Sequence, residues 1–157
     1  MSVTDIYKII KRPIITEKTT NLKKQNKKIV FTNGCFDLLH IGHIRTFKKA
    51  KSLGDVLIVA VNSDKSVRKL KGKNRPIIKD KFRMEVLSAI EYIDYIVKFD
   101  EDTPIKLIKY LKPDIIVKGS DWKKENVVGK ELSKVVLAPF IKGWSTTEII
   151  NKIKNID

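Results

Sequence analysis

The sequence has only one cysteine and no long apolar segment, and both shortages exclude whole classes of protein. Cys35 stands alone among 157 residues, so it can form no internal disulfide and cannot by itself hold a structural zinc ion. No apolar run approaches the roughly 20 residues that a membrane-spanning helix requires. Charges at Asp5, Lys8, Lys11 and Arg12 interrupt any hydrophobic signal segment at the N-terminus. These absences indicate a soluble, reduced, cytoplasmic protein without a membrane segment.

Acidic residues are scarce relative to basic ones. The sequence has 18 Asp and Glu residues against 33 Lys and Arg residues, which gives a net charge of +15. This excess favours anionic partners such as nucleic acid, a membrane surface or a phosphorylated small molecule, and charge alone does not choose among them. The apolar fraction of 42% is sufficient for a core and excludes wholesale disorder. The length fits one domain, or one domain with a short extension.

Residues 1–27 form a basic N-terminal extension that differs in composition from residues 28–157. The extension has no glycine and a single proline, Pro13. We predict a short helix over residues 4–11, which Pro13 ends. Residues 9–18 resemble the start of a large-subunit ribosomal protein that lies beside the peptide exit tunnel, and this resemblance implies an arm that contacts RNA. A docking or frayed extension is the alternative.

After the extension, apolar runs of strand length alternate with amphipathic segments of helical length. This alternation predicts an α/β protein, a Rossmann-like three-layer α/β/α fold with a five-stranded parallel sheet. Ligands bind such sheets at the carboxyl ends of the strands, so we expect function in the loops after Thr32, Val61, Val117 and Leu137. The expected strands lie near residues 29–32, 56–61, 95–97, 115–117 and 135–137, the helices near 41–52, 81–90, 104–111 and 145–153, and a basic loop at 65–79.

The chain's only two histidines follow the first predicted strand, at the start of the next helix. His40 and His43 are three residues apart, which puts both imidazoles on one side of the first helical turn. Gly42 between them lets a phosphate approach the backbone, and the free N–H groups of a helix N-terminus attract anions. This combination predicts polyphosphate binding. A zinc site completed by Cys35 or Asp37 is the alternative, and the strand-to-helix position favours phosphate.

A second candidate anion site begins the last predicted helix. Ser145 follows Gly143-Trp144 and precedes two threonines, Thr146 and Thr147. A serine at a helix N-cap leaves hydroxyl and N–H groups available for an anion. A plain helix cap is the alternative interpretation.

These motifs resemble a known family. His40-Ile41-Gly42-His43 resembles the signature shared by small nucleotidyltransferases and class I aminoacyl-tRNA synthetases, although a synthetase would need a longer chain and a lysine-serine signature. Residues 32–40 are similar to the cytidylyltransferase-like branch, which includes glycerol-3-phosphate cytidylyltransferase and the heptose 1-phosphate adenylyltransferases. The segment 143–150 agrees with this family. The resemblance covers residues 28–154, so we interpret 28–157 as a nucleotidyltransferase domain.

Within the family, the stretches 60–64, 70–76, 99–104 and 113–121 resemble the heptose branch. Where the glycerol phosphate branch has an arginine, this chain has Phe140. The resemblance implies transfer of AMP from ATP to a heptose 1-phosphate, with release of pyrophosphate, toward a lipopolysaccharide precursor. It also implies Mg²⁺ carried by the triphosphate and a homodimer. The kinase half that often accompanies the heptose enzyme would be a separate chain.

Two alternatives stay open. One is a cytidylyltransferase that acts on glycerol 3-phosphate or another polyol phosphate. The other is an RNA-binding or ribosome-associated module, which the basic extension and the charge suggest.

The resemblance also assigns site residues. His40, His43 and Lys71 are the expected catalytic residues, with Lys69 as the alternative lysine. Asp37 and Arg83 are expected to bind the acceptor, and a surface or ion-paired position on a helix is the alternative for Arg83. Trp122 and Trp144 either line the base pocket or pack ordinarily, and no protein ligand to a metal is expected. The expected nucleotide-binding residues are Asn33, Gly34, Cys35, Phe36, Gly42, Gly119, Asp121, Ser145, Thr146 and Thr147.

Overall fold

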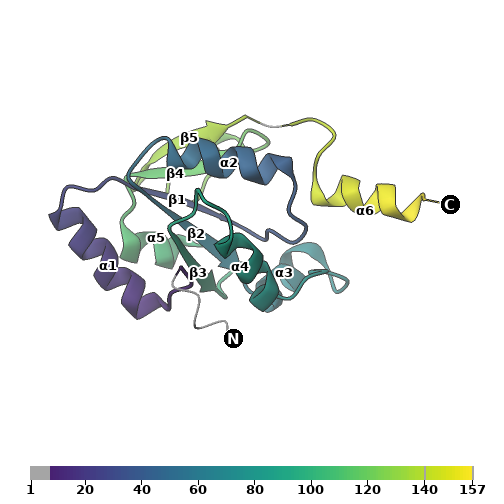
Figure 1. The fold of residues 1–157 in the computed structure, drawn as a ribbon, viewed down its shortest axis with the longest axis horizontal. Helices are drawn as coiled ribbons and strands as arrows, with labels where there is room; N and C mark the ends of the chain where they lie inside the picture. The colour runs from purple at the N-terminus through teal and green to yellow at the C-terminus, as the bar shows by residue number, and fades with distance from the viewer. Residues whose placement is uncertain (1–7, 140, 157) are drawn as a thin grey trace.

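Five parallel strands form the centre of the structure, a computed structural model that describes residues 8–139 and 141–156 (Figure 1). The strands are paired in the order β3-β2-β1-β4-β5, so the expected five-stranded parallel sheet is confirmed. The strands are β1 (Ile29–Gly34), β2 (Val56–Asn62), β3 (Tyr95–Phe99), β4 (Ile115–Gly119) and β5 (Lys134–Ala138). The helices are α1 (Arg12–Lys24), α2 (Ile41–Lys51), α3 (Asp64–Lys71), α4 (Asp80–Ser88), α5 (Ile105–Leu111), the short 3₁₀ helix η2 (Lys124–Asn126) and α6 (Thr146–Lys154).

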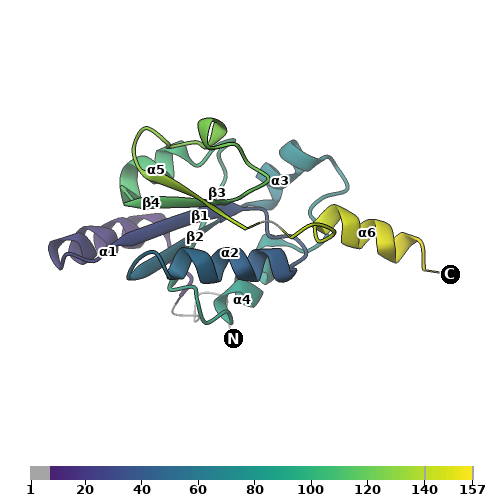
Figure 2. The same cartoon turned by 90° about the horizontal axis from the view of Figure 1, so that it is seen from above.

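Helices cover both faces of the sheet, which gives the expected three layers (Figure 2). On one face, Phe47 of α2 and Leu87 of α4 pack in one apolar cluster with Val59 of β2. On the other face, Ile15 of α1 and Ile108 of α5 belong to a second cluster. All seven residues of β2 are buried, as expected for a central parallel strand with helices on both sides.

The strand order reverses beside β1. The chain builds β2 and β3 on one side of β1 and then crosses to build β4 and β5 on the other. The carboxyl ends of β1 and β4 therefore border the topological switch point, where sheets of this kind form a crevice for ligands.

The N-terminal segment differs from its prediction. Residues 8–11 are not helical, because Ile9 forms a parallel bridge with Ile96 of β3. The remainder of the predicted helix, residues 4–7, lies outside the described residues. Pro13 is the second residue of α1 and does not end a helix, because the N–H groups of the first helical turn have no partner within the helix. Ile15 is fully buried, so the segment 8–24 shares a core with the rest of the chain.

The expected basic loop is partly a helix. Residues 64–71 form α3, capped by the Ser63 side chain, which accepts a hydrogen bond from the Ser66 N–H. Val67 is the one apolar residue that α3 buries, so the segment has no apolar stripe from which a helix could be recognised. Residues 72–79 remain a loop apart from isolated turns.

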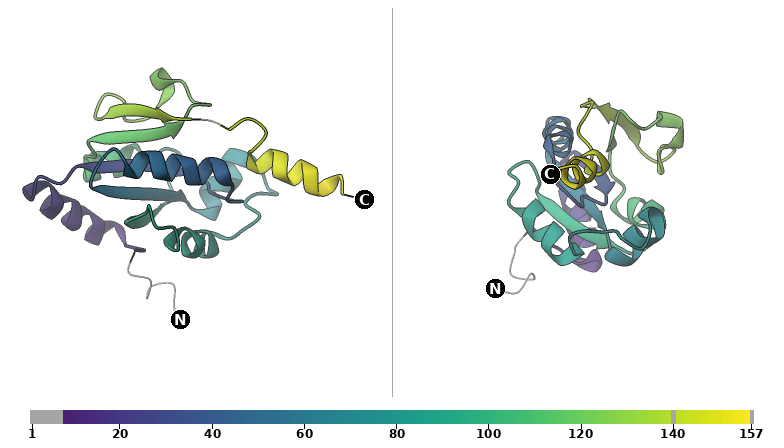
Figure 3. Two further views of the ribbon diagram at one scale, coloured as in Figure 1. Left: turned by 45° about the horizontal axis from the view of Figure 1, so that its top comes forward. Right: turned by 90° about the vertical axis from the view of Figure 1, so that its right-hand side faces the viewer.

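Helix α6 projects from the body of the molecule, beyond the carboxyl edge of the sheet (Figure 3). None of its residues is fully buried. Among the described residues, no helix has the length and apolarity needed to cross a membrane.

Candidate active site at the carboxyl edge of the sheet

A cavity of about 560 Å³ opens at the switch point. It brings together the loop after β1, the start of α2, the end of α3, the end of β4 and the start of α6, as the strand polarity predicts. All the expected site residues except Arg83 line it. They are Asn33, Gly34, Cys35, Phe36, Asp37, His40, Gly42, His43, Lys71, Gly119, Asp121, Ser145, Thr146 and Thr147.

The two histidines cap α2 together. His40 is the N-cap residue, and its Nδ1 accepts a hydrogen bond from the Gly42 N–H at 3.2 Å. The Nδ1 of His43 accepts from the backbone N–H of His40 at 3.4 Å. The ring centroids are 3.9 Å apart. The sequence spacing thus places both imidazoles side by side at the N-terminus of α2.

These hydrogen bonds fix the tautomer of each ring. Because each Nδ1 accepts a backbone N–H, it carries no proton, so the proton of each neutral imidazole is on Nε2. Burial and the neighbouring His40 lower the pKa of His43 to about 3, and burial also lowers the pKa of His40. Both rings are therefore neutral N–H donors at neutral pH.

Two glycines lie in close contact with aromatic rings of the site. A Cβ at Gly42 would lie 3.0 Å from the His40 ring. A Cβ at Gly34 would lie 3.0 Å from the Phe36 ring, whose edge packs against His43 at a centroid distance of 5.3 Å. A side chain at either position would require the His40 or the Phe36 ring to shift by a few tenths of an ångström.

The start of α6 reaches residues 35–40, the histidine loop between β1 and α2, from a distant part of the chain. Ser145 caps α6 by accepting a hydrogen bond from the Glu148 N–H at 3.2 Å. The Thr146 hydroxyl donates to the carbonyl of Leu38 at 3.3 Å, across 108 residues of sequence. The structure therefore brings together the two candidate anion sites that the sequence suggested.

The two candidate lysines of α3 differ in their surroundings. Lys71 lines the cavity, whereas Lys69 does not. The Lys69 ammonium forms an ion pair with Asp102 at 2.5 Å, and both side chains are exposed. Because Lys71 lines the cavity, it is better placed than Lys69 to contact a ligand there.

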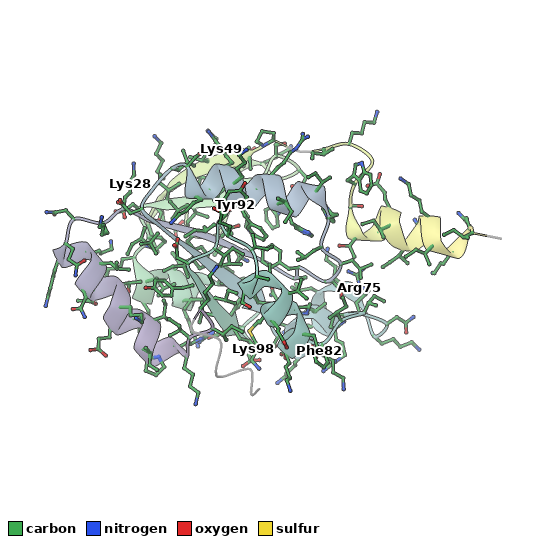
Figure 4. The ribbon with its side chains drawn as sticks, viewed as in Figure 1. Lys28, Lys49, Arg75, Phe82, Tyr92 and Lys98 are labelled. Carbon is green, nitrogen blue, oxygen red and sulfur yellow. The ribbon has the colours of Figure 1, made fainter. Side chains whose placement is uncertain are left out.

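Asp37 has three internal partners. Its fully buried carboxylate accepts hydrogen bonds from the Ile77 and Ile78 N–H groups at 2.9 and 2.8 Å. It also accepts from the Nε of Arg75 at 2.5 Å. These donors hold the pKa of Asp37 below its usual value despite burial. Asp37 thus fixes the loop 72–79 and Arg75, which Figure 4 shows at the end of the molecule from which α6 projects.

The structure does not bring Arg83 to the cavity. Its side chain is fully buried and forms an ion pair with Asp64 at 2.8 Å. The guanidinium donates to three backbone carbonyls as well, those of Cys35, Asn62 and Ile78. Arg83 ties α4 to the ends of β1 and β2, so the structure agrees with the alternative of an ion-paired helix residue and not with an acceptor contact.

Sequence reasoning missed two basic residues that line the cavity, Arg75 and Lys118. Arg75 makes an ion pair through Nε, and its Nη groups form no hydrogen bond or ion pair within the described residues. Lys118 is the fourth residue of β4 and is buried. A lysine within a buried strand was the available signal for Lys118, since lysines are rarely buried.

The alternative of a zinc site is not supported. Within residues 8–139 and 141–156, no three His, Cys, Asp or Glu side chains are grouped closely enough to hold a metal ion. Burial raises the pKa of the Cys35 thiol, so Cys35 is a neutral group in the cavity wall.

Comparison with known proteins agrees with this site. Residues 31–152 match the family model described as cytidylyltransferase-like. The chain is 56% identical over 140 residues to a bifunctional protein HldE from Campylobacter jejuni subsp. doylei, with 88% of this chain and 30% of that protein covered. A bifunctional protein HldE from Geobacter metallireducens is 55% identical over 136 residues, which cover 83% of this chain and 28% of that protein. The chain thus spans less than a third of the length of these relatives.

Two solved structures are also similar. A lipopolysaccharide core biosynthesis protein from Thermoplasma volcanium has a TM-score of 0.60 and 32% identity, covering 74% of this chain and 98% of that one. A pantoate-beta-alanine ligase from Francisella tularensis, complexed with an ATP ligand and beta-alanine, has a TM-score of 0.64 over 94% of this chain and 78% of that one. At 20% identity, the second likeness concerns the fold alone. From the family match and these identities, this chain belongs to the cytidylyltransferase-like family of nucleotidyltransferases.

Proposed function

We propose that this chain transfers AMP from ATP to the phosphate of a heptose 1-phosphate and releases pyrophosphate. The observation that carries the proposal is the convergence of His40, His43 and the start of α6 on one cavity at the switch point. The heptose acceptor is supported by the similarity to the HldE proteins and to a lipopolysaccharide core biosynthesis protein.

In this reaction, an oxygen of the acceptor phosphate attacks the α-phosphorus of ATP. The bond between the α-phosphorus and the bridging oxygen to the β-phosphate breaks, and pyrophosphate leaves with that electron pair. No proton transfer or covalent enzyme intermediate is needed, so catalysis depends on positioning and on stabilising the charge that moves to the leaving group.

The neutral histidines suit this task. Each Nε2–H can donate to a phosphate oxygen, and the backbone hydrogen bonds at Nδ1 hold the rings in place beforehand. Ser145, Thr146 and Thr147 would bind the phosphates with hydroxyl and N–H groups. Asn33, Gly34, Cys35, Phe36 and Gly42 would contact the nucleotide between the end of β1 and the start of α2, and Gly119 and Asp121 would border its base and ribose.

The remaining charge would be neutralised by basic residues and magnesium. Lys71 would act as a second clamp on the triphosphate. Mg²⁺ would enter with ATP as part of the substrate. The acceptor phosphate would meet the Nη groups of Arg75, which Asp37 holds in position, so Asp37 would serve the acceptor indirectly.

The test is an assay of pyrophosphate release with a panel of substrates. ATP and CTP are each paired with heptose 1-phosphate, glycerol 3-phosphate and another polyol phosphate, in magnesium buffer. Release with ATP and heptose 1-phosphate is expected to exceed every other pair at least tenfold. Preference for CTP with a polyol phosphate would reassign the substrates, and no release with any pair would refute the transferase proposal.

The expected homodimer and RNA contact are separate proposals. Exposed apolar side chains on α4 and α6, Phe82, Val86 and Ile153, support a dimer, which sedimentation velocity tests. The exposed lysines of α1 support RNA contact, which salt-dependent binding tests. Because Ile15 is in the core, this test should exchange Lys18, Lys23 and Lys24 for Glu instead of deleting residues 1–27.

A further inference from the structure

Lys118 is a buried cation at the centre of the proposed site. It follows three buried apolar residues of β4 and is itself only 9% exposed. Its ammonium donates a hydrogen bond to the Asn33 carbonyl at 2.8 Å and lies 4.8 Å from the centroid of the Trp122 ring. Both contacts connect β4 to the cavity wall, because Asn33 and Trp122 also line the cavity.

Lys118 forms no ion pair in the described part of the chain, although the carboxylate of Asp121, which also lines the cavity, acts on its charge from a greater distance. No carboxylate there forms an ion pair with its Nζ. The other buried cation, Arg83, is instead neutralised by Asp64. Burying a charge without an ion-pair partner is costly, and a bound anionic ligand would offset that cost. The cost is visible in the pKa of Lys118, which burial lowers to about 8.

The position of Lys118 indicates the kind of ligand that it binds. β4 adjoins β1 at the switch point, and Asn33 lies near the end of β1, just before the loop that leads to His40. The hydrogen bond to the Asn33 carbonyl holds the ammonium beside the end of β1, which leads into the loop of the two histidines. A group that already gives one hydrogen bond to a carbonyl can give two more, which suits the oxygens of a phosphate.

We propose that Lys118 is a further catalytic residue, whose ammonium binds an oxygen of a substrate phosphate at the switch point. This inference rests on the proposed transferase function. The phosphate belongs to ATP or to the acceptor, and the shared chemistry is a phosphate oxyanion that neutralises Lys118 and is bound more tightly as charge develops in the transition state.

The test compares Lys118→Met and Lys118→Gln with a matched control, Lys98→Met. Lys98 is also the fourth residue of a five-residue strand, β3, but it is exposed and does not line the cavity (labelled in Figure 4). Calorimetry measures the binding of Mg-ATP alone and of the sugar phosphate alone, and a separate assay measures kcat. Circular dichroism melting shows that each variant is folded, and the Gln variant retains a donor for the Asn33 carbonyl.

Both Lys118 variants should lose at least tenfold in affinity for one of the two ligands and about 10²-fold in kcat. Their melting temperatures should equal or exceed that of the wild type, because the substitution removes a buried charge. Loss with Mg-ATP assigns the contact to the nucleotide, and loss with the sugar phosphate assigns it to the acceptor. The Lys98 variant should match the wild type within twofold.

Affinity and kcat within twofold of the wild type would overturn the proposal. A large drop in melting temperature with unchanged ligand affinity would also overturn it, because it would make Lys118 structural. Failure of the transferase proposal is distinguishable, since the wild type would then release no pyrophosphate while the Mg-ATP binding measurement could still be read.

Discussion

The first and last helices of the described chain are attached to the sheet in opposite ways. Helix α1 buries Ile15 and Thr19, and Leu22 packs against the same core cluster. Helix α6 buries no residue completely, and it touches the histidine loop through polar groups at its first turn, including Thr146. Apolar burial stabilises the fold, whereas a polar helix start facing a cavity serves ligands. The comparison therefore predicts that α1 contributes stability and that α6 contributes binding.

The largest expected effect is on kcat, at the histidines beside the start of α6. The substitution His43→Ala should lower kcat by about 10²–10³, because it removes a pre-oriented donor to a phosphate oxygen. Kinetics of pyrophosphate release measure this effect, with Lys48→Ala on the exposed side of the same helix as the control. An active His43→Ala variant would remove the histidines from the mechanism.

The core contact of α1 should give the largest change in stability. The substitution Ile15→Ala should lower the free energy of unfolding by about 2–5 kcal/mol, because it leaves a cavity under α1. Urea unfolding measures this change, and kcat of the folded variant should stay within twofold of the wild type. Ile14 is 49% exposed, so Ile14→Ala is the matched control and should be nearly neutral. Equal losses for both would show that α1 is not docked in this way.

The cap of α6 should give a smaller effect, and mainly on binding. The substitution Ser145→Ala should cost about 1 kcal/mol as a lost helix cap and raise the KM for ATP several-fold. Ser63 caps α3 in the same way but does not line the cavity, so Ser63→Ala should cost similar stability without changing KM. If both variants leave KM unchanged, Ser145 is a plain cap.

The smallest expected effect concerns the start of α1. The Arg12 guanidinium pairs with Glu101 through two hydrogen bonds and lowers the pKa of that carboxyl to about 2. Because the folded pKa is below the unfolded one, the contribution to stability is present above about pH 4.5 and is lost as the pH falls through about 2. The pair is partly exposed, so we expect about 1 kcal/mol or less at pH 7.

Urea unfolding of Glu101→Gln at pH 7 and pH 2 tests this dependence. The difference from the wild type should shrink toward zero at the lower pH. Glu17→Gln, an exposed position on α1, serves as the control. A difference that grows on acidification would contradict the assigned sign.

Much of the fold was predictable because its signals are local. The continuous apolar runs of β2 and β4 predicted the parallel sheet. The paired histidines and the Ser145 cap predicted two parts of the cavity lining. Pro13 was misread because proline is compatible both with ending a helix and with beginning one. Helix α3 was missed because its support comes from polar contacts such as that of Asn62 with Ser66.

The roles of several charged residues depend on tertiary contacts and could not be read from spacing. Arg83 donates four hydrogen bonds inside the fold. Arg75 is held in position by Asp37, which is 38 residues away in sequence. Lys71 could be separated from Lys69 only by seeing which one lines the cavity. Pairing partners of buried charges are thus the part of the site that required the structure.

The most direct test of the central claim is a crystal structure with Mg-ATP bound. The proposed function predicts the triphosphate within hydrogen-bond distance of Nε2 of His40 and His43 and of the start of α6. A nucleotide bound elsewhere, with these groups untouched, would contradict the assignment of the cavity as the transfer site.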